Sequence, residues 1–163
     1  MDIHIARQLT TRYHWGQMYG DKTYMYHLEK VIKTLKALDR YSEVNVCVAY
    51  LHDILEDTTC TVDDLTHHFG TKIVNPVLLL TREKDTRFKS YLECIRTSKT
   101  ATLIKLCVRY VNMQECLDNN STLGKKYLKE YSVFREVLYE PQEHKLLWSL
   151  LDKVSKKLEY LHK

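Results

Sequence analysis

Residues 50–58 read YLHDILEDT, and they close a stretch that is apolar on almost every side from residue 42 to residue 55. An all-round apolar pattern is typical of a helix buried at the centre of a domain. Imidazole and carboxylate groups near a core cost several kcal/mol unless they are paired or bind a metal. A divalent cation would be a suitable partner for His52 and Asp53, which stand side by side at the end of this stretch.

A third metal donor is expected from the preceding helical segment, residues 23–38. There His27 shares one sector of a 3.6-residue helix with Val31 and Leu35. The imidazole of His27 therefore faces inward, toward the buried His-Asp pair. Mixed imidazole and carboxylate ligation suits Mn, Fe or Zn and leaves open positions for water and substrate. Such a metal would polarise a phosphoryl oxygen and activate a bound water.

The distribution of apolar residues predicts the fold class. Glycine and proline number only four and two, and apolar residues recur at spacings of three and four along nearly the whole chain. We predict an all-α fold, one helical bundle of about seven or more helices forming a single domain over residues 1–163. Pro76 argues against a strand in the apolar segment 72–81, because it would remove a ladder hydrogen bond. The predicted helices cover residues 23–38, 42–55, 62–69, 72–81, 87–97, 100–117, 124–138 and 141–161, with the last two packing on the others.

Charge and cysteine content exclude several classes of protein. The net charge of +4 is spread along the sequence, without the dense basic cluster of a nucleic-acid or lipid surface, and it is compatible with an anionic small molecule. No stretch approaches the ~18 consecutive apolar residues of a membrane span or forms a signal h-region. The five cysteines are an odd number without a CxxC pair, which favours reduced thiols and a cytoplasmic protein. The oligomeric state stays open.

Five motifs occur in order along residues 12–117: HWGQ (14–17), YMYH (24–27), YLHDILEDT (50–58), VDDLTHHFG (62–70) and IKLCVRYVNM (104–113). They resemble the HD-domain phosphohydrolases of the SpoT and metazoan SpoT-homologue type, whose pattern runs HxGQ, YxxH, LLHDxxEDT, FG and KLADRxxN. The HDxxEDT and KLxxRxxN segments are specific to this branch of the HD superfamily. The resemblance implies an HD-domain bundle that releases pyrophosphate from a guanosine alarmone, (p)ppGpp.

The resemblance also implies roles for individual residues. Proteins of this type hold Mn²⁺ with two histidines, the HD aspartate and the aspartate of KLADR, and His27, His52 and Asp53 match the first three. Glu56 and Asp57 match the EDT carboxylates, which lie near the attacking water for acid/base work.

Further matches concern the nucleotide. Arg12 precedes the HxGQ motif, and Arg109 and Asn112 match the arginine and asparagine of KLADRxxN, so all three are implied to bind substrate. Tyr24 is one of the tyrosines close enough to the motifs to stack on a base.

The chain departs from the pattern at the fourth metal ligand, where Val108 replaces the aspartate of KLADR. Valine has no lone pair to donate, so we expect weaker metal binding and impaired turnover. Glu115, two turns further along the same helix, is the nearest conceivable substitute, and we expect it not to reach the metal. Val108 leaves open whether the chain is a disabled enzyme, a natural degenerate one, or an enzyme with water in the vacant position.

Two other functions remain open on the sequence alone. The same chemistry could act on another nucleotide, such as a dNTP, an NMP or NADPH. Alternatively, the protein could be a non-catalytic nucleotide-binding HD protein that has kept the pocket and lost turnover.

Overall fold

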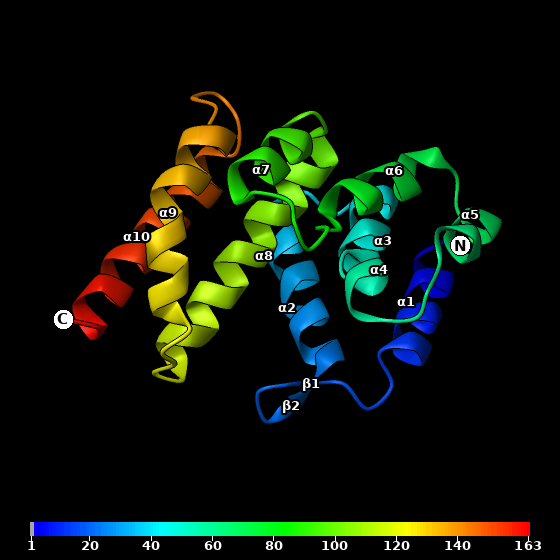
Figure 1. Cartoon of the computed structure of the whole chain (residues 1–163), viewed down its shortest axis with the longest axis horizontal. Coiled ribbons are helices and arrows are strands. Elements are labelled where there is room, and N and C mark those ends of the chain that lie inside the picture. Colours follow the sequence, from blue (N-terminus) through cyan, green and yellow to red (C-terminus); the bar gives the residue numbers. More distant parts are fainter. Residues whose placement is uncertain (1) are drawn as a thin grey trace.

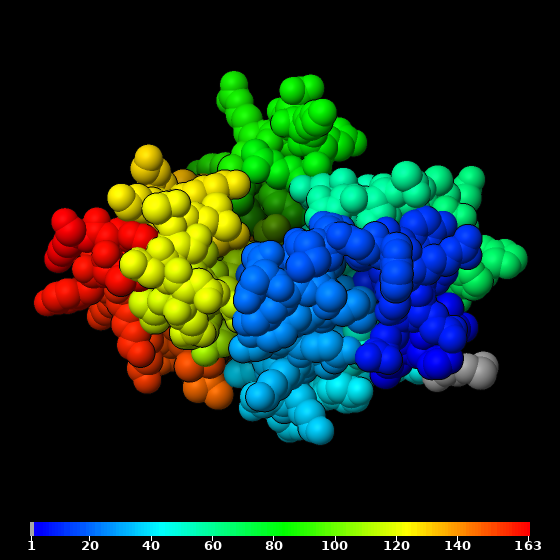
Figure 2. Space-filling view, turned by 90° about the horizontal axis from the view of Figure 1, so that it is seen from below, coloured from blue at the N-terminus to red at the C-terminus, as the bar shows by residue number. Residues whose placement is uncertain are grey.

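The computed structural model describes residues 2–163, and their fold is helical, as predicted (Figure 1). The elements are α1 (Asp2–Tyr13), β1 (Met18–Tyr19), β2 (Lys22–Thr23), α2 (Tyr24–Ala37), α3 (Glu43–Leu51), α4 (Ile54–Asp57), α5 (Val62–His68), α6 (Thr71–Leu80), α7 (Phe88–Arg96), α8 (Lys99–Asp118), α9 (Gly124–Leu138) and α10 (Lys145–Leu161). The two ends of the chain lie on opposite sides of the molecule (Figures 1 and 2).

The 20-residue helix α8 is the centre of the bundle. Its buried residues fall on most of its circumference, and it packs against α2, α3 and α6 on one side and α7, α9 and α10 on the other (Figure 1). The Ser98 side chain accepts a hydrogen bond from the Ala101 amide at 3.3 Å and caps the helix start. The motif residues on α8 are therefore held between two halves of the molecule.

The predicted helix over residues 42–55 is wrong at its C-terminal end. Helix α3 begins after the cap residue Ser42 but stops at Leu51, and the backbone turns through His52 and Asp53 before the single turn α4. The apolar pattern continues through this break because Ile54 is also fully buried. The break places the His-Asp pair at a helix end, where both side chains can face the same point.

The N-terminal part contains two features that the sequence did not predict. Helix α1 buries only Ala6 and Thr10, and it is tied to α3 by the Thr10 hydroxyl, which donates to the Tyr50 carbonyl at 2.9 Å. The strands β1 and β2 pair antiparallel as a short hairpin. With two residues each, they are too short to show strand-like alternation.

The C-terminal helices pack on α8, as predicted, although α10 starts at Lys145 rather than at residue 141. Leu147, Leu151, Val154 and Leu158 are buried in the common core. Segment 72–81 is helical as predicted, with Pro76 inside α6. Within residues 2–163, none of the helices combines the length and the apolar character needed to cross a bilayer.

Candidate active site

Three potential metal donors meet where α2 passes the end of α3. His27 comes from α2, and His52 and Asp53 come from the turn after α3. One donor atom of each side chain lies within 4.8 Å of the others, and the two imidazole rings are 5.5 Å apart. Both histidines are only 2% exposed. We call these three residues the triad.

The orientation of His52 leaves a lone pair facing Asp53. Its Nδ1 lies 2.8 Å from the Ala49 carbonyl oxygen and must donate the hydrogen bond, so in the neutral ring Nε2 carries the lone pair. Nε2 is 2.9 Å from the Asp53 carboxylate, an arrangement that needs a proton or a cation between the two acceptors. A backbone carbonyl that fixes the tautomer in this way is the usual support of a metal-bound histidine.

The electrostatics of the triad follow from burial and mutual charge. Burial lowers the pKa of His27 to about 3, so its ring is neutral and its Nδ1 has no hydrogen-bond partner among the described residues. Burial alone would lower the pKa of His52, but the charge of Asp53 outweighs it and raises that pKa. Burial alone would raise the pKa of Asp53, but the charge of His52 outweighs it and holds that pKa below its usual range. The triad thus holds a neutral imidazole, His27, beside a His52–Asp53 pair in which each charged form stabilises the other.

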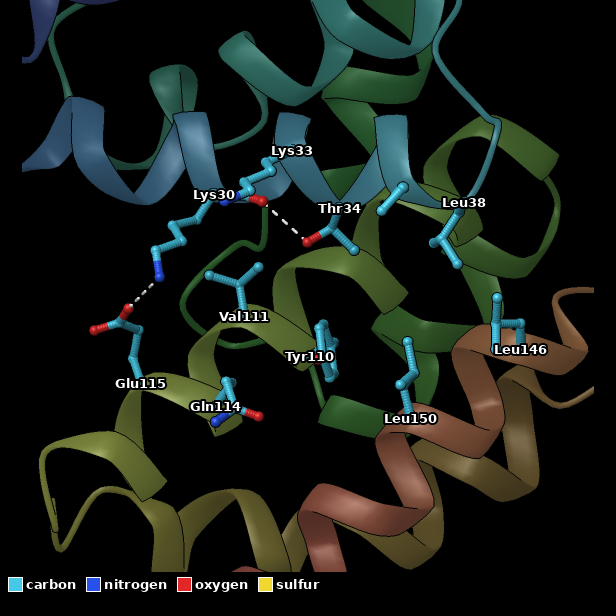
Figure 3. A pocket seen from close by; sticks show the side chains of 11 residues that line it. Lys30, Lys33, Thr34, Leu38, Tyr110, Val111, Gln114, Glu115, Leu146 and Leu150 are labelled. Carbon is cyan, nitrogen blue, oxygen red and sulfur yellow. Dashed lines mark hydrogen bonds and ion pairs between the residues drawn. The ribbon is translucent and has the colours of Figure 1, made fainter.

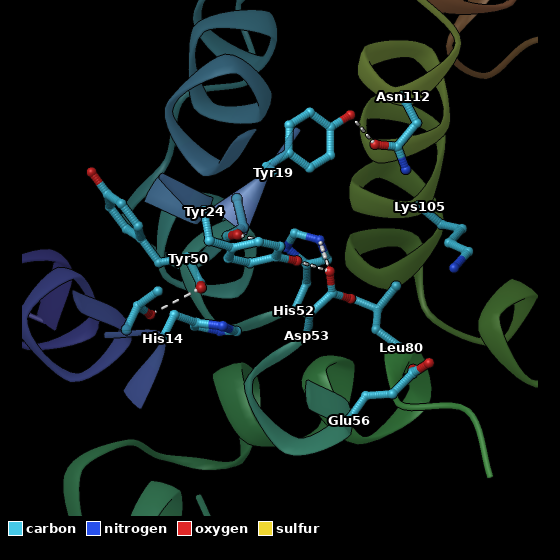
Figure 4. Close-up of polar contacts among 12 residues, drawn as sticks. His14, Tyr19, Tyr24, Tyr50, His52, Asp53, Glu56, Leu80, Lys105 and Asn112 are labelled. Carbon is cyan, nitrogen blue, oxygen red and sulfur yellow. Dashed lines mark hydrogen bonds and ion pairs between the residues drawn. The ribbon is translucent and has the colours of Figure 1, made fainter. Parts of the chain in front are cut away.

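Aromatic side chains around the triad position Asp53. The Tyr24 hydroxyl donates to Asp53 Oδ2 (Figure 4). The Tyr24 ring stacks on His14 at 4.4 Å, and His14 Nδ1 donates to the Gln17 side-chain oxygen at 2.5 Å. The sequence suggested a base-stacking role for Tyr24, but the structure instead places its ring against His14.

A cavity of about 230 Å³ opens beside the triad. Its wall includes Asp53, Glu56, Val108 and Asn112, and it carries four cationic side chains. The complete lining is Asp53, Glu56, Arg82, Phe88, Tyr91, Lys105, Val108, Arg109, Asn112, Lys126, Tyr127 and Glu130. We call this space the cationic cavity.

Lys105 lines this cavity and lies within the motif IKLCVRYVNM, but the sequence did not predict a functional role for it. Its ammonium donates to the Tyr91 hydroxyl at 2.9 Å, and burial lowers its pKa to about 8. Its position one helical turn before Arg109 could have suggested a shared face. Arg82 and Lys126 come from segments outside the motifs. Arg82 opens the basic segment REKDTRFK (82–89), whereas no sequence signal marks Lys126.

The two candidate acid/base residues separate in the structure. Glu56 lines the cationic cavity, and its carboxylate accepts a hydrogen bond from the Arg82 amide at 2.9 Å. Asp57 does not line the cavity, and its carboxylate interacts with Gln17. Burial and then the charge of Asp53 raise the pKa of Asp57.

The predicted substrate residues also differ in their placement. Asn112 lines the cationic cavity. Arg12 is exposed at the end of α1, 5.9 Å over the ring of Tyr13, and the structure does not bring it to the cavity.

Arg109 is largely a structural residue. It is 5% exposed, its Nη2 lies 2.6 Å from the Glu130 carboxylate, and its guanidinium packs over the rings of Tyr127 and Phe134 at 4.6 and 4.8 Å. Its Nη1, which is buried, has no hydrogen-bond partner within residues 2–163. Arg109 therefore joins α8 to α9 and adds positive charge to the cavity wall.

Replacing Arg109 by methionine is expected to lower the free energy of unfolding by about 2–4 kcal/mol. The variant leaves Glu130 without its partner, and the partial exposure of Glu130 keeps the loss below that of a fully buried pair. Urea denaturation measures the change. The matched control is Arg135→Met, which breaks the more exposed Arg135–Asp152 pair and should cost at most about 1 kcal/mol. An unchanged urea midpoint in the Arg109 variant would show that the pair is not structural.

Glu115 is not among the donors that gather with the triad. Its carboxylate accepts from the Tyr26 hydroxyl at 2.9 Å and lies 3.5 Å from the Lys30 ammonium. The pair borders a different cavity of about 420 Å³ between α2, α8 and α10, which has a largely apolar lining (Figure 3). Val108, by contrast, is 7% exposed and lines the cationic cavity together with Asp53.

No protein-family model matches the sequence, and no curated protein matches it either. A solved structure described as a metazoan orthologue of SpoT, which hydrolyses ppGpp and plays a role in starvation responses, is similar to this chain. The TM-score is 0.78 with 20% sequence identity, over 96% of this chain and 94% of that one. This likeness shows the fold, so the predicted all-helical bundle, with the fold of a SpoT orthologue, is confirmed.

Proposed function

We propose that this protein has the site of a metal-dependent phosphohydrolase that releases pyrophosphate from a guanosine nucleotide bearing a 3′-pyrophosphate, and that Val108 impairs its turnover. The observation that carries the proposal is the position of the triad, which opens directly on a cavity with four cationic side chains. A metal and an anion would lie side by side there. The similarity to a ppGpp hydrolase supports this substrate among the possible nucleotides.

The triad suits a first-row divalent ion, and we propose Mn²⁺. His27 Nδ1 is buried without a hydrogen-bond partner in the described chain, and His52 Nε2 faces the Asp53 carboxylate at 2.9 Å, an arrangement that a metal bound by all three would satisfy. Asp53 supplies the anionic donor, and the Tyr24 hydroxyl donates to its carboxylate and so fixes its orientation. When bound, the ion would polarise a phosphoryl oxygen and lower the pKa of a bound water.

The cationic cavity suits the phosphate groups of the substrate. Lys105, Arg82 and Lys126 line it, and the unpartnered Nη1 of Arg109 adds a buried cation behind them. Charge-assisted hydrogen bonds of this kind are the strong ones in phosphate recognition. At about 230 Å³ the cavity is smaller than typical pockets for whole ligands, which start near ~300 Å³, so it fits the pyrophosphate rather than the entire nucleotide.

Glu56 is the carboxylate best placed for proton transfer, because it lines the cavity beside Asp53. We propose that it accepts a proton from the attacking water. The oxygen of that water bonds to phosphorus, the bond from phosphorus to the 3′ oxygen breaks, and the 3′ oxygen leaves as a hydroxyl after taking up a proton. Asp57 interacts with Gln17 and does not line the cavity, so we do not assign it this proton transfer.

Val108 favours a second candidate, a nucleotide-binding protein without turnover. The position contributes an apolar side chain to the cavity wall where the resemblance implies a carboxylate ligand. The four cationic side chains of the cavity could bind the phosphates of a nucleotide without that ligand. Calorimetry that detects no guanosine tetraphosphate binding, with or without Mn²⁺, would exclude both this candidate and the enzyme.

Lys105 provides the test of the phosphate site. Its pKa of about 8 means that the free protein loses this charge as the pH rises from 7 to 9, where an ordinary lysine stays protonated. We therefore expect the affinity for guanosine tetraphosphate to fall over this range, because the anion favours the protonated ammonium. Lys105→Met should lower the affinity at pH 7 by about 10-fold or more, which corresponds to one hydrogen bond to a charged group, and should flatten the pH dependence.

The matched control for Lys105→Met is Lys129→Met, which removes an exposed lysine of α9 outside the cavity. Calorimetric titrations at pH 7, 8 and 9 measure all three proteins. Equal affinities of the wild type and the Lys105 variant for guanosine tetraphosphate would show that the phosphates do not bind in this cavity.

A further inference from the structure

The β1–β2 hairpin is joined to the rest of the molecule at few points. Its two strands contact α2, and Gly16 and Gly20, on either side of β1, have positive φ values of 80° and 62°. Trp15 is 86% exposed and Met18 is 55% exposed, so neither anchors the hairpin. Residues in such segments are the ones that absorb the backbone rotation of a moving flap.

One side chain of the hairpin crosses to α8. The Tyr19 ring stacks on His27 at 4.7 Å between ring centroids, with 27° between the planes. The Tyr19 hydroxyl donates to the side-chain oxygen of Asn112 at 2.8 Å, which Figure 4 shows as the link between the hairpin and α8. Tyr19 thus bridges a residue of the triad and a residue of the cationic cavity.

The position of Tyr19 restricts access to both His27 and Asn112. Its ring covers one face of His27, and its hydroxyl occupies the Asn112 oxygen. On its other side Tyr19 lines a separate hollow of about 510 Å³, together with Glu115 and Asn119. Tyr19 does not line the cationic cavity itself but reaches it through Asn112, which does. A ligand that binds both the covered face of His27 and the Asn112 oxygen therefore has to displace Tyr19.

We propose that the Tyr19–Asn112 hydrogen bond is a latch that holds the hairpin closed over the active site. Release of the bond frees Asn112 and uncovers His27, so the ligand binds the unlatched form. The ligand in this scheme rests on the proposed function, whereas the latch itself is a property of the free protein.

A single neutral hydrogen bond makes a latch of modest strength. Its net contribution shifts the closed-to-open equilibrium by about three- to tenfold. When only a small fraction of the molecules is open, the apparent affinity is reduced by that fraction. Loosening the latch should therefore strengthen binding, whereas removing a residue that contacts the ligand would weaken it.

Tyr19→Phe removes the hydroxyl and keeps the ring on His27. The matched control is Tyr131→Phe, because the Tyr131 hydroxyl also links two helices, α9 and α10, through Asp152 at 2.7 Å, away from the hairpin and the triad. Hydrogen exchange of the free proteins follows the hairpin directly, for example at the Tyr24 amide, which donates to the Gln17 carbonyl at 3.0 Å. We expect exchange about three- to tenfold faster in Tyr19→Phe and unchanged in Tyr131→Phe. Equal exchange in Tyr19→Phe and the wild type would overturn the latch.

Calorimetric titration of guanosine tetraphosphate in the presence of Mn²⁺ gives the second readout. We expect Tyr19→Phe to bind about three- to tenfold more tightly than the wild type, and Tyr131→Phe to bind equally. Unchanged or weaker binding by Tyr19→Phe would also overturn the latch. If neither the wild type nor the variants bind the nucleotide, the proposed function fails, and hydrogen exchange alone decides whether the latch exists.

Discussion

Replacing Asp53 by asparagine is expected to weaken Mn²⁺ binding by more than about 100-fold, beyond the range for a residue that only supports a ligand. Asp53 is the one anionic donor of the triad, and an amide oxygen provides no charge to offset the cation. The change is nearly isosteric and keeps an oxygen that can accept from Tyr24. Isothermal titration of the apoprotein with Mn²⁺ measures the loss.

Asp57→Asn is the matched control for this experiment. It alters a carboxylate only four residues away that lies outside the triad and interacts with Gln17. Its Mn²⁺ affinity should stay within a few-fold of the wild type. If the Asp53 and Asp57 variants both bind Mn²⁺ as the wild type does, the triad is not the metal site.

The second large effect is a gain, expected for Val108→Asp. Val108 shares the wall of the cationic cavity with Asp53, so an aspartate there would add a second carboxylate at the metal site. We expect the Mn²⁺ affinity to rise by about 10- to 100-fold. Without metal, the buried charge beside Asp53 should destabilise the fold by several kcal/mol. Thermal unfolding should therefore show a lower Tm for the apo variant and a larger upward shift on adding Mn²⁺ than in the wild type.

Val111→Asp separates the ligand effect from the cost of any buried carboxylate. Val111 is also buried on α8, but it lines the apolar cavity next to Leu150 rather than the triad. This variant should lose stability with and without Mn²⁺ and gain no metal affinity. An equal Mn²⁺ response in the two variants would mean that position 108 does not face the metal.

The sequence predicted the helices that bury a continuous apolar stripe, such as α2, in which Leu28, Val31 and Leu35 are buried. It missed α1, because only Ala6 and Thr10 of that helix are buried and the rest of its surface is polar or half-exposed. It also predicted a helix that continues past His52, whereas α3 ends at Leu51. The apolar pattern does not reveal the backbone turn between Leu51 and Ile54. Hydrophobic periodicity reports which face is buried and carries no information on where the backbone turns.

The residues of the site also divide into those that the sequence could predict and those that it could not. His27, His52 and Asp53 could be grouped from the sequence because two are adjacent and the third lies on the inward face of the preceding helix. The cationic cavity could not, because Arg82, Lys105 and Lys126 come from three segments that only the tertiary structure brings together. Tyr19 escaped notice for a related reason: its contacts with His27 and Asn112 join positions up to 93 residues apart.

Release of pyrophosphate from guanosine tetraphosphate, measured side by side for the wild type and Val108→Asp at saturating Mn²⁺, tests the proposed function most directly. We expect little or no release by the wild type, release at least about tenfold faster by the aspartate variant, and none from either protein after chelation of the metal. A Val108→Asp protein that is folded and loaded with Mn²⁺ but leaves guanosine tetraphosphate intact would contradict the proposal that this fold is an alarmone hydrolase.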